Sequence, residues 1–128
     1  RGLLADHASV RGRAGAVMLF AVDFDGTFSR DPVLFRALVA LGRRMGHTFV
    51  LVTGRSDEGQ WGAEVRRAVG DIMPIVFAAD GWKRTAAHAA GYRVDVWIDD
   101  NPEWIARQDP AAAEKREKQT REALGLPK

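Results

Sequence analysis

Residues 17–27, VMLFAVDFDGT, give the clearest indication of the fold in this chain. The stretch opens as a nearly continuous apolar run of strand length, which predicts a strand buried on both faces. The run ends in Asp23 and Asp25, and Gly26 then permits a backbone turn that a side chain would obstruct. The stretch therefore predicts a buried strand that brings two carboxylates to its carboxyl end.

Beyond this run, segments of strand and helix character alternate along the chain. Further buried strands are expected at residues 48–53, 75–79 and 94–98, and helices at residues 32–46, 56–69, 82–90, 102–107 and 110–124. In the first of these helices, apolar residues recur at helical spacing: Val33, Leu34, Ala37, Leu38 and Leu41. Buried strands that alternate with helices predict an α/β fold, a Rossmann-like three-layer sandwich around a parallel sheet of four to five strands.

Polar residues follow every expected strand. They are Asp23 and Asp25 after the first strand, Thr53, Gly54 and Arg55 after the second, Asp80, Gly81 and Lys83 after the third, and Asp99, Asp100 and Asn101 after the fourth. In open parallel sheets, ligands bind beyond the carboxyl ends of the strands, where the strand order reverses. The sequence therefore predicts one site at this edge of the sheet.

Four carboxylates in that set, Asp23, Asp25, Asp99 and Asp100, would repel one another unless they share a cation or a proton. Oxygen ligands without histidine or cysteine favour Mg²⁺, which binds one or two carboxylates together with substrate phosphate. A lone aspartate at a strand end is usually a turn or cap residue. Four of them at two strand ends favour a metal site instead.

The spacing of Asp23 and Asp25 suggests covalent phosphoryl transfer. Residues two apart on an ideal strand face the same way, so one carboxylate can attack phosphorus while the other donates and accepts the proton. The remaining task is charge neutralisation, which Mg²⁺, Lys83, the Thr53 hydroxyl and backbone N–H groups can supply.

Four motifs occur in a fixed order over roughly residues 17–105: DFDGT, VLVTGR, a lysine before a helix, and VWIDD. Together they resemble the haloacid dehalogenase (HAD) superfamily of phosphatases. The resemblance implies that Asp23 is the nucleophile and a metal ligand. It implies that Asp25 is the general acid and base, and that its backbone carbonyl also binds the metal.

The same resemblance assigns the other motif residues. Thr53 and Gly54 would bind the transferring phosphoryl group, and Lys83 would neutralise its charge, with the adjacent Arg84 as the alternative phosphate contact. Asp99 would bind Mg²⁺, and Asp100 would bind it or orient its waters.

The spacing between motifs leaves no room for a cap domain. Residues 28–47 can hold one helix, and residues 54–82 can hold a helix, a strand and a turn. Many relatives close a cap over small substrates, so the resemblance implies a capless enzyme with an open site. Such a site suits a macromolecular substrate or a lid from a partner subunit, and a homo-oligomer is one interpretation that stays open.

The composition limits which classes of fold and function are possible for this chain. A chain of 128 residues with 46% hydrophobic residues suits one core, and the absence of cysteine excludes disulfides and cysteine nucleophiles. The net charge of +2 comes from dispersed basic residues, which favour solvated helix faces over a nucleic-acid-binding block. The expected organisation is an extension or tag at residues 1–17, a catalytic core at 18–108 and a charged helix at 109–128. No apolar run is long enough for a membrane span, and a cytoplasmic setting is expected.

The tryptophans and histidines outside the motifs have less specific interpretations. Trp61 is expected to pack in the core or against its helix, and Trp97 to lie in the core. Trp82 and Trp104 could stack on a base or shield the edge of the domain, and both interpretations stay open. His47 and His88 are assigned structural roles.

The function expected from the sequence is a Mg²⁺-dependent phosphomonoesterase that works through an aspartyl-phosphate. A nucleotide or polynucleotide end is the favoured substrate, and a sugar phosphate is the second candidate. One alternative is a catalytically idle domain that binds a phosphorylated partner or nucleic acid. Another is a phosphotransferase that passes the group to an acceptor other than water.

Overall fold

The computed structural model describes residues 17–107 and 110–127 of the chain. The extension expected at residues 1–17 lies, apart from Val17, outside the described residues. Along the chain the elements are β1 (Leu19–Val22), η1 (Phe28–Arg30), α2 (Pro32–Arg44), β2 (Thr48–Thr53), α3 (Gly59–Val69), β3 (Ile75–Phe77), α4 (Lys83–Ala89), β4 (Val96–Ile98), η2 (Pro102–Trp104) and α5 (Pro110–Leu124).

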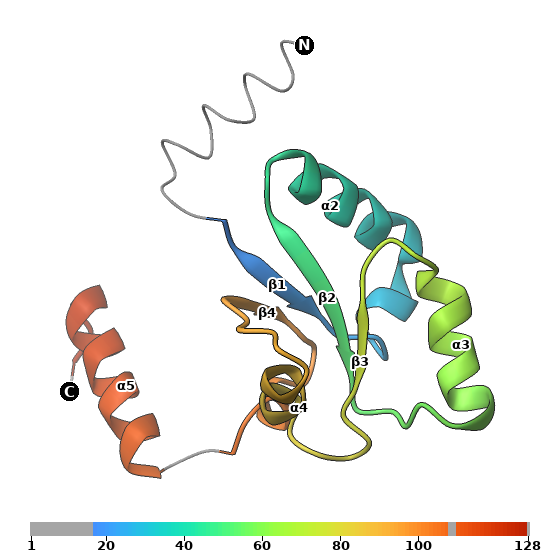
Figure 1. The fold of residues 1–128 in the computed structure, drawn as a ribbon. Helices are drawn as coiled ribbons and strands as arrows, with labels where there is room; N and C mark the ends of the chain where they lie inside the picture. Colours follow the sequence, from blue (N-terminus) through green and yellow to red (C-terminus); the bar gives the residue numbers. More distant parts are fainter. Residues whose placement is uncertain (1–16, 108–109, 128) are drawn as a thin grey trace.

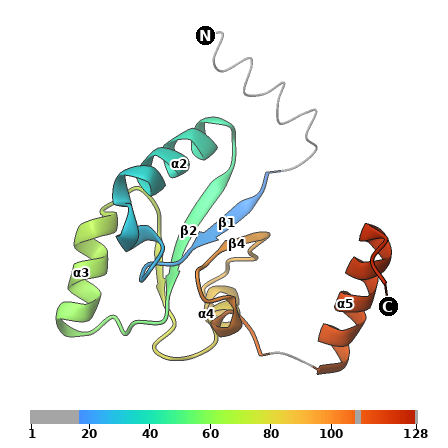
Figure 2. The ribbon, with the colours of Figure 1, turned by 180° about the vertical axis from the view of Figure 1, so that it is seen from behind.

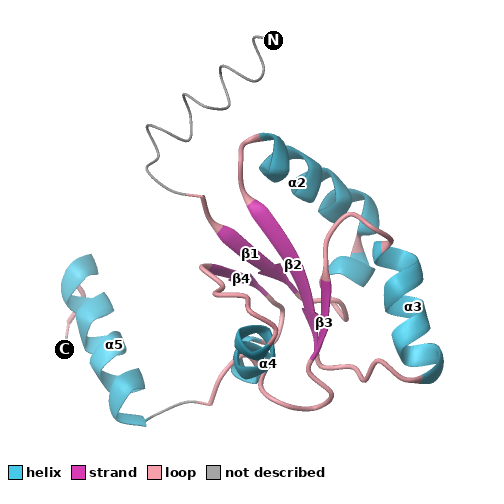
Figure 3. Cartoon of the chain, in the orientation of Figure 1, coloured by secondary structure: helices cyan, strands magenta, loops and turns pink. Residues whose placement is uncertain are grey.

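The sheet is parallel throughout and has the strand order β3-β2-β1-β4 (Figure 3). Val22 of β1 is in register with Leu51 of β2 on one side and with Ile98 of β4 on the other. The predicted α/β fold with a parallel sheet is confirmed, and the described residues form four strands rather than five. The architecture is that of a Rossmann-like sandwich.

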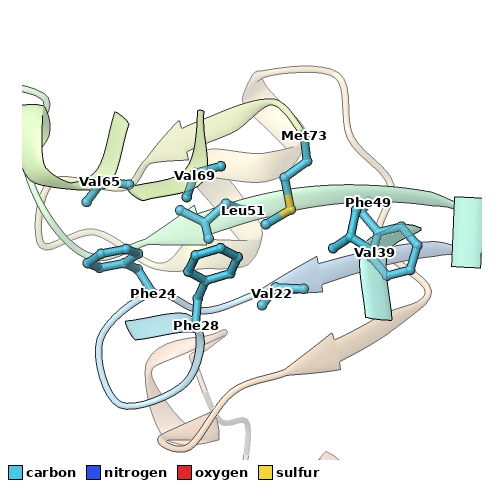
Figure 4. Close-up of a cluster of buried hydrophobic side chains, with 9 residues drawn as sticks. All are labelled: Val22, Phe24, Phe28, Val39, Phe49, Leu51, Val65, Val69 and Met73. Atoms are coloured by element: carbon cyan, nitrogen blue, oxygen red, sulfur yellow. The ribbon is translucent and has the colours of Figure 1, made fainter. Parts of the chain in front are cut away.

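Both faces of the sheet are buried, as the continuous apolar strands predict. Val22 and Leu51 point into one cluster, which α2, α3 and the loop after β1 cover (Figure 4). Ala21 and Val50, their neighbours in sequence, point into a second cluster that contains Ala87 of α4. Because successive side chains of a strand alternate between faces, the same strands serve both layers. Figure 1 shows α2 and α3 on one side of the sheet and α4 on the other.

Helix α2 forms where it is expected, and Asp31 caps it by accepting a hydrogen bond of 3.0 Å from the Leu34 N–H. However, the apolar residues at helical spacing do not face the sheet. Val33 is 79% exposed and Leu41 is 55% exposed. A second apolar set, which includes Val39, packs inward instead, because Gly42 lets the helix approach the ring of Phe49.

Several boundaries differ from the expected ones. Helix α3 begins at Gly59 rather than at Ser56, because the Ser56 hydroxyl accepts a hydrogen bond from Glu58 N–H and forms a turn ahead of the helix. The short helix expected at residues 102–107 is the 3₁₀ turn η2. Helix α5 stands away from the sheet in both views (Figures 1 and 2).

Among the described residues, no helix combines the length and the apolar character that a membrane crossing requires.

Candidate active site

The polar residues that follow the strands gather at the carboxyl edge of the sheet, at its switch point. The chain runs outward from β1 to β2 and β3, and β4 then pairs with the opposite side of β1. The Asp23 N–H donates to Ile98 O at 2.9 Å, so the ends of β1 and β4 stay paired up to the first carboxylate. An open pocket of about 750 Å³ lies here, and its lining includes Asp23, Lys83 and Asp99. The predicted location of the site therefore matches a pocket.

At the floor of the pocket, one ammonium group joins two carboxylates. Lys83 Nζ lies 2.7 Å from Asp23 Oδ1 and 2.6 Å from Asp99 Oδ2. The side chains of all three residues are at most 7% exposed. Lys83 is the first residue of α4, so the helix start fixes its backbone beneath the strand ends. A buried charge without a partner would cost several kcal/mol, so each of these groups depends on the others.

Thr27 links this floor to the second aspartate of the VWIDD motif. Its hydroxyl lies 3.1 Å from Asp23 Oδ2 and 3.4 Å from Asp100 Oδ1, and it accepts from the Asp100 N–H at 3.3 Å. Gly26 makes the approach of Asp100 feasible. It has a φ of +78°, and any side chain at this position would collide with the Asp100 carboxylate. The turn expected at Gly26 is confirmed.

Three carboxylates at this point could hold a cation. Asp23, Asp99 and Asp100 each offer an oxygen, and these oxygens all lie within 4.8 Å of one another. Hard oxygen donors without nitrogen or sulfur suit Mg²⁺ or Ca²⁺. The side chain of Asp25 is not part of this group, since it points to a different partner.

The shared charges perturb the titration of these groups. Burial raises the pKa of Asp23 to about 6, against the opposing effect of the hydrogen bond from Lys83. The hydrogen bond with Asp23 lowers the pKa of the exposed Asp100. Burial alone would lower the pKa of Lys83, but the hydrogen bonds to Asp23 and Asp99 raise it. Of Asp23 and Asp100, Asp23 therefore binds a proton more readily, beside a charged Lys83.

Asp25 belongs to a second cluster, centred on Arg55. The guanidinium donates to both Asp25 oxygens, at 2.7 and 2.9 Å, and also pairs with Glu64 at 2.9 Å. It lies 5.0 Å from the centroid of the Phe24 ring and 4.7 Å from that of the Trp61 ring. These contacts fix Arg55 firmly, and Arg55 in turn fixes the Asp25 carboxylate.

The other predicted phosphate contacts take different positions. Gly54 lines the pocket, and it has no side chain to cover its N–H. Thr53 is fully buried, outside the lining of the pocket, and its hydroxyl accepts from Arg55 N–H at 3.2 Å. Lys83 reaches the floor, whereas Arg84 is exposed and does not line the pocket. Of the two basic candidates, the structure therefore places Lys83 among the carboxylates.

Of the two packing positions expected for Trp61, in the core or against its helix, the core position is wrong. Trp61 is 66% exposed, because its ring covers Arg55 at the pocket rim instead of the apolar cluster. Trp97 packs against the second cluster, as expected, and its buried Nε1 has no hydrogen-bond partner within the part of the chain that the structure describes. His47 accepts from Met18 N–H at 3.1 Å and meets the edge of Phe20, which agrees with a structural role.

Two residues of the site were not singled out from the sequence. Thr27 could have been found as the last residue of DFDGT, where its hydroxyl falls one turn after Asp23. Asn101 donates from its backbone N–H to Asp99 Oδ1 at 2.9 Å, and its amide contacts Trp104. The sequence shows Asn101 as a polar residue at a strand end, but no pattern in it indicates the contact with Trp104.

Comparison with known proteins identifies no relative. No family model matches the chain, and neither the curated proteins nor the solved structures contain a match. The site must therefore be interpreted from its own geometry.

Proposed function

We propose that this chain is a Mg²⁺-dependent phosphomonoesterase of the HAD-like, capless type. The observation that carries the proposal is the position of Lys83 Nζ, 2.7 Å from Asp23 and 2.6 Å from Asp99 at the floor of an open pocket. A nucleophilic carboxylate, a fixed positive charge and further carboxylates for a metal are the groups that phosphoryl transfer needs.

The metal would be held by Asp23, Asp99 and Asp100, whose oxygens lie close enough together to share one ion. When bound, Mg²⁺ would neutralise charge on the phosphoryl oxygens and on the carboxylates around them. The donor set fits this ion because it contains oxygen alone.

In the first step, a carboxylate oxygen of Asp23 attacks phosphorus and the ester bond to the leaving oxygen breaks. Asp25 gives its proton to that oxygen, and the product alcohol departs. In the second step, Asp25 takes a proton from water, the water oxygen attacks phosphorus, and the bond to Asp23 breaks to release phosphate. Lys83 balances the charge on the phosphoryl oxygens in both steps.

The ion pair between Arg55 and Asp25 sets a condition on these two reaction steps. In the structure, both Asp25 oxygens accept hydrogen bonds from Arg55, so neither oxygen is free to hold a proton for the leaving group. Asp25 must therefore exchange one of these bonds for a proton before it can act as an acid. A leaving group that takes over a guanidinium hydrogen bond on arrival would free one Asp25 oxygen, which would then take its proton from solvent water.

The same pairing favours a second candidate function. A domain that binds a phosphorylated partner without hydrolysing it needs no free acid, and a carboxylate locked by Arg55 suits that role. The two candidates differ in turnover, since only the phosphatase releases inorganic phosphate repeatedly.

The decisive test measures phosphate release from a generic aryl phosphate with Mg²⁺ and with excess chelator. We expect turnover with Mg²⁺, none with chelator, and a loss of at least a thousandfold, on the order expected for a missing nucleophile, in Asp23→Asn. Asp71→Asn is the matched control, because this exposed carboxylate lines a separate pocket and not the candidate site. Equal activity of Asp23→Asn and the wild type would refute the proposal.

A further inference from the structure

Three of the four tryptophans in the chain are exposed, and they gather around the candidate active site. Trp61 is 66% exposed, Trp104 is 53% exposed and Trp82 is 39% exposed. Trp61 and Trp104 line the pocket, and Trp82 packs on Trp104. Tryptophan contributes a large apolar area when it is buried, so exposed tryptophans that converge on one pocket indicate a binding surface.

Trp104 is held in place by polar contacts rather than by the core. In the amide orientation that satisfies both groups, Asn101 Oδ1 accepts from Trp104 Nε1 at 2.7 Å. The backbone of Asn101 is itself bound to Asp99 at 2.9 Å. Trp82 supports the ring, with a centroid separation of 6.4 Å and an interplanar angle of 35°. The indole of Trp104 is therefore fixed relative to the floor of the pocket while much of its surface stays open.

Trp61 stands on the other flank of the pocket. It comes from the segment after β2, whereas Trp104 follows β4, and these two strands flank β1. Asp23, at the end of β1, thus lies between the two flanks. Trp61 packs one face on Arg55, which fixes the ring, and the side chain remains largely exposed.

This arrangement separates a buried ionic floor from an exposed aromatic rim. A phosphoryl group that reaches Asp23 and Lys83 would leave the rest of its ester at the rim. A ligand that uses both parts needs a phosphate, a short polar spacer and a flat ring. A nucleobase joined to its phosphate through a ribose has this order of parts, and every base can stack on an aromatic side chain.

We propose that the pocket binds a phosphate monoester that carries a nucleobase, with the base stacked on Trp104 and its phosphate at Asp23. The inference rests on the proposed function for the role of the floor, and it adds the class of the leaving group. Trp82 supports the stacking ring, and Trp61 forms the second wall. The proposed ligand is a nucleoside monophosphate, either free or at the end of a nucleic-acid strand.

The kinetic test compares two esters, a nucleoside 3′-monophosphate and glycerol 2-phosphate, on the wild type and on Trp104→Ala and Trp104→Phe. The ratio of their kcat/KM values isolates the contribution of the base. We expect this ratio to favour the nucleotide, to fall about tenfold in Trp104→Ala, and to be largely restored in Trp104→Phe. An unchanged ratio in Trp104→Ala would overturn the inference even if phosphatase activity is strong.

A binding test separates this inference from the proposed function. Asp23→Asn protein is titrated with adenosine monophosphate or ribose 5-phosphate, and tryptophan fluorescence is recorded. We expect the nucleotide to quench the fluorescence, and we expect this quenching to fall by more than half in the double variant that combines Asp23→Asn with Trp104→Phe. The sugar phosphate should cause little quenching. Nucleotide binding of this kind without turnover by the wild type would uphold the base site and refute the phosphatase. Equal responses to both ligands would refute the base site.

The source of the base is decided by a third comparison. A 3′-phosphorylated oligonucleotide and the matching mononucleotide are assayed at equal concentration. A higher kcat/KM for the oligonucleotide assigns the site to strand ends, and a higher value for the mononucleotide assigns it to free nucleotides. Both results support a base site, whereas a preference for the baseless ester over both contradicts it.

Discussion

The guanidinium of Arg55 holds the carboxylate of Asp25 through two hydrogen bonds, of 2.7 and 2.9 Å. The two residues come from the loops after β2 and β1, so their pairing joins two neighbouring strand ends at the site. Arg55 is only 11% exposed, although Asp25 is 55% exposed. Phe24 lies near the guanidinium and links the pair to the core beneath it.

Arg55→Ala should therefore lower the stability of the fold. We expect a loss of about 1–2 kcal/mol, because the change removes the stacking on Phe24 and Trp61 as well as ion pairs that solvent partly screens. Urea unfolding followed by circular dichroism measures this loss. Arg121→Ala is the matched control, since its pair with Glu117 lies on exposed α5 and should contribute at most a few tenths of a kcal/mol. Equal losses in the two variants would show that the Arg55 cluster has no special role.

The buried ammonium gives a second prediction. Lys83→Met keeps much of the side-chain volume but leaves Asp23 and Asp99 without their shared cation. We expect a loss of about 3 kcal/mol in metal-free protein, because two neighbouring buried carboxylates would lose their compensating charge. Lys118→Met, on exposed α5, controls for the loss of a lysine and should have no measurable effect. A metal-free Lys83→Met protein as stable as the wild type would contradict this account of the site.

Metal addition should act on the same carboxylates. If Asp23, Asp99 and Asp100 bind Mg²⁺, the ion should raise the melting temperature, because a ligand that binds only the folded state stabilises it by about 2.7 kcal/mol at a hundred times its Kd. Asp99→Asn should reduce this Mg²⁺-dependent shift by more than half, whereas Asp71→Asn should leave it intact. Differential scanning fluorimetry over a Mg²⁺ series gives the comparison. A shift of equal size in Asp99→Asn would place the bound ion elsewhere.

The location of the site was predictable from the sequence, and its internal contacts were not. Apolar strands that each end in polar residues are visible in a linear chain, and the parallel sheet confirms that these ends meet. The orientation of α2 was not predictable, because the helix carries two apolar faces, and tertiary contacts select the one with Phe35, Val39 and Gly42. The position of Trp61 escaped prediction for a similar reason. Its ring packs on a charged residue, Arg55, and the spacing of hydrophobic residues in a sequence cannot predict such a contact.

Gly26 allows backbone strain to be separated from a steric clash. A side chain at this position would suffer a φ of +78° and would also collide with the carboxylate of Asp100. Gly91 is the matched control, since its φ is +92° and a side chain there would meet nothing within 4 Å. We expect both alanine variants to lose about 1–2 kcal/mol of stability from the strained backbone. Only Gly26→Ala should also weaken the Mg²⁺-dependent rise in melting temperature, because it alone displaces a proposed ligand. Urea unfolding gives the first quantity and scanning fluorimetry the second. If Gly91→Ala weakens the response to Mg²⁺ as much as Gly26→Ala does, the packing of Gly26 against Asp100 has no part in holding the metal.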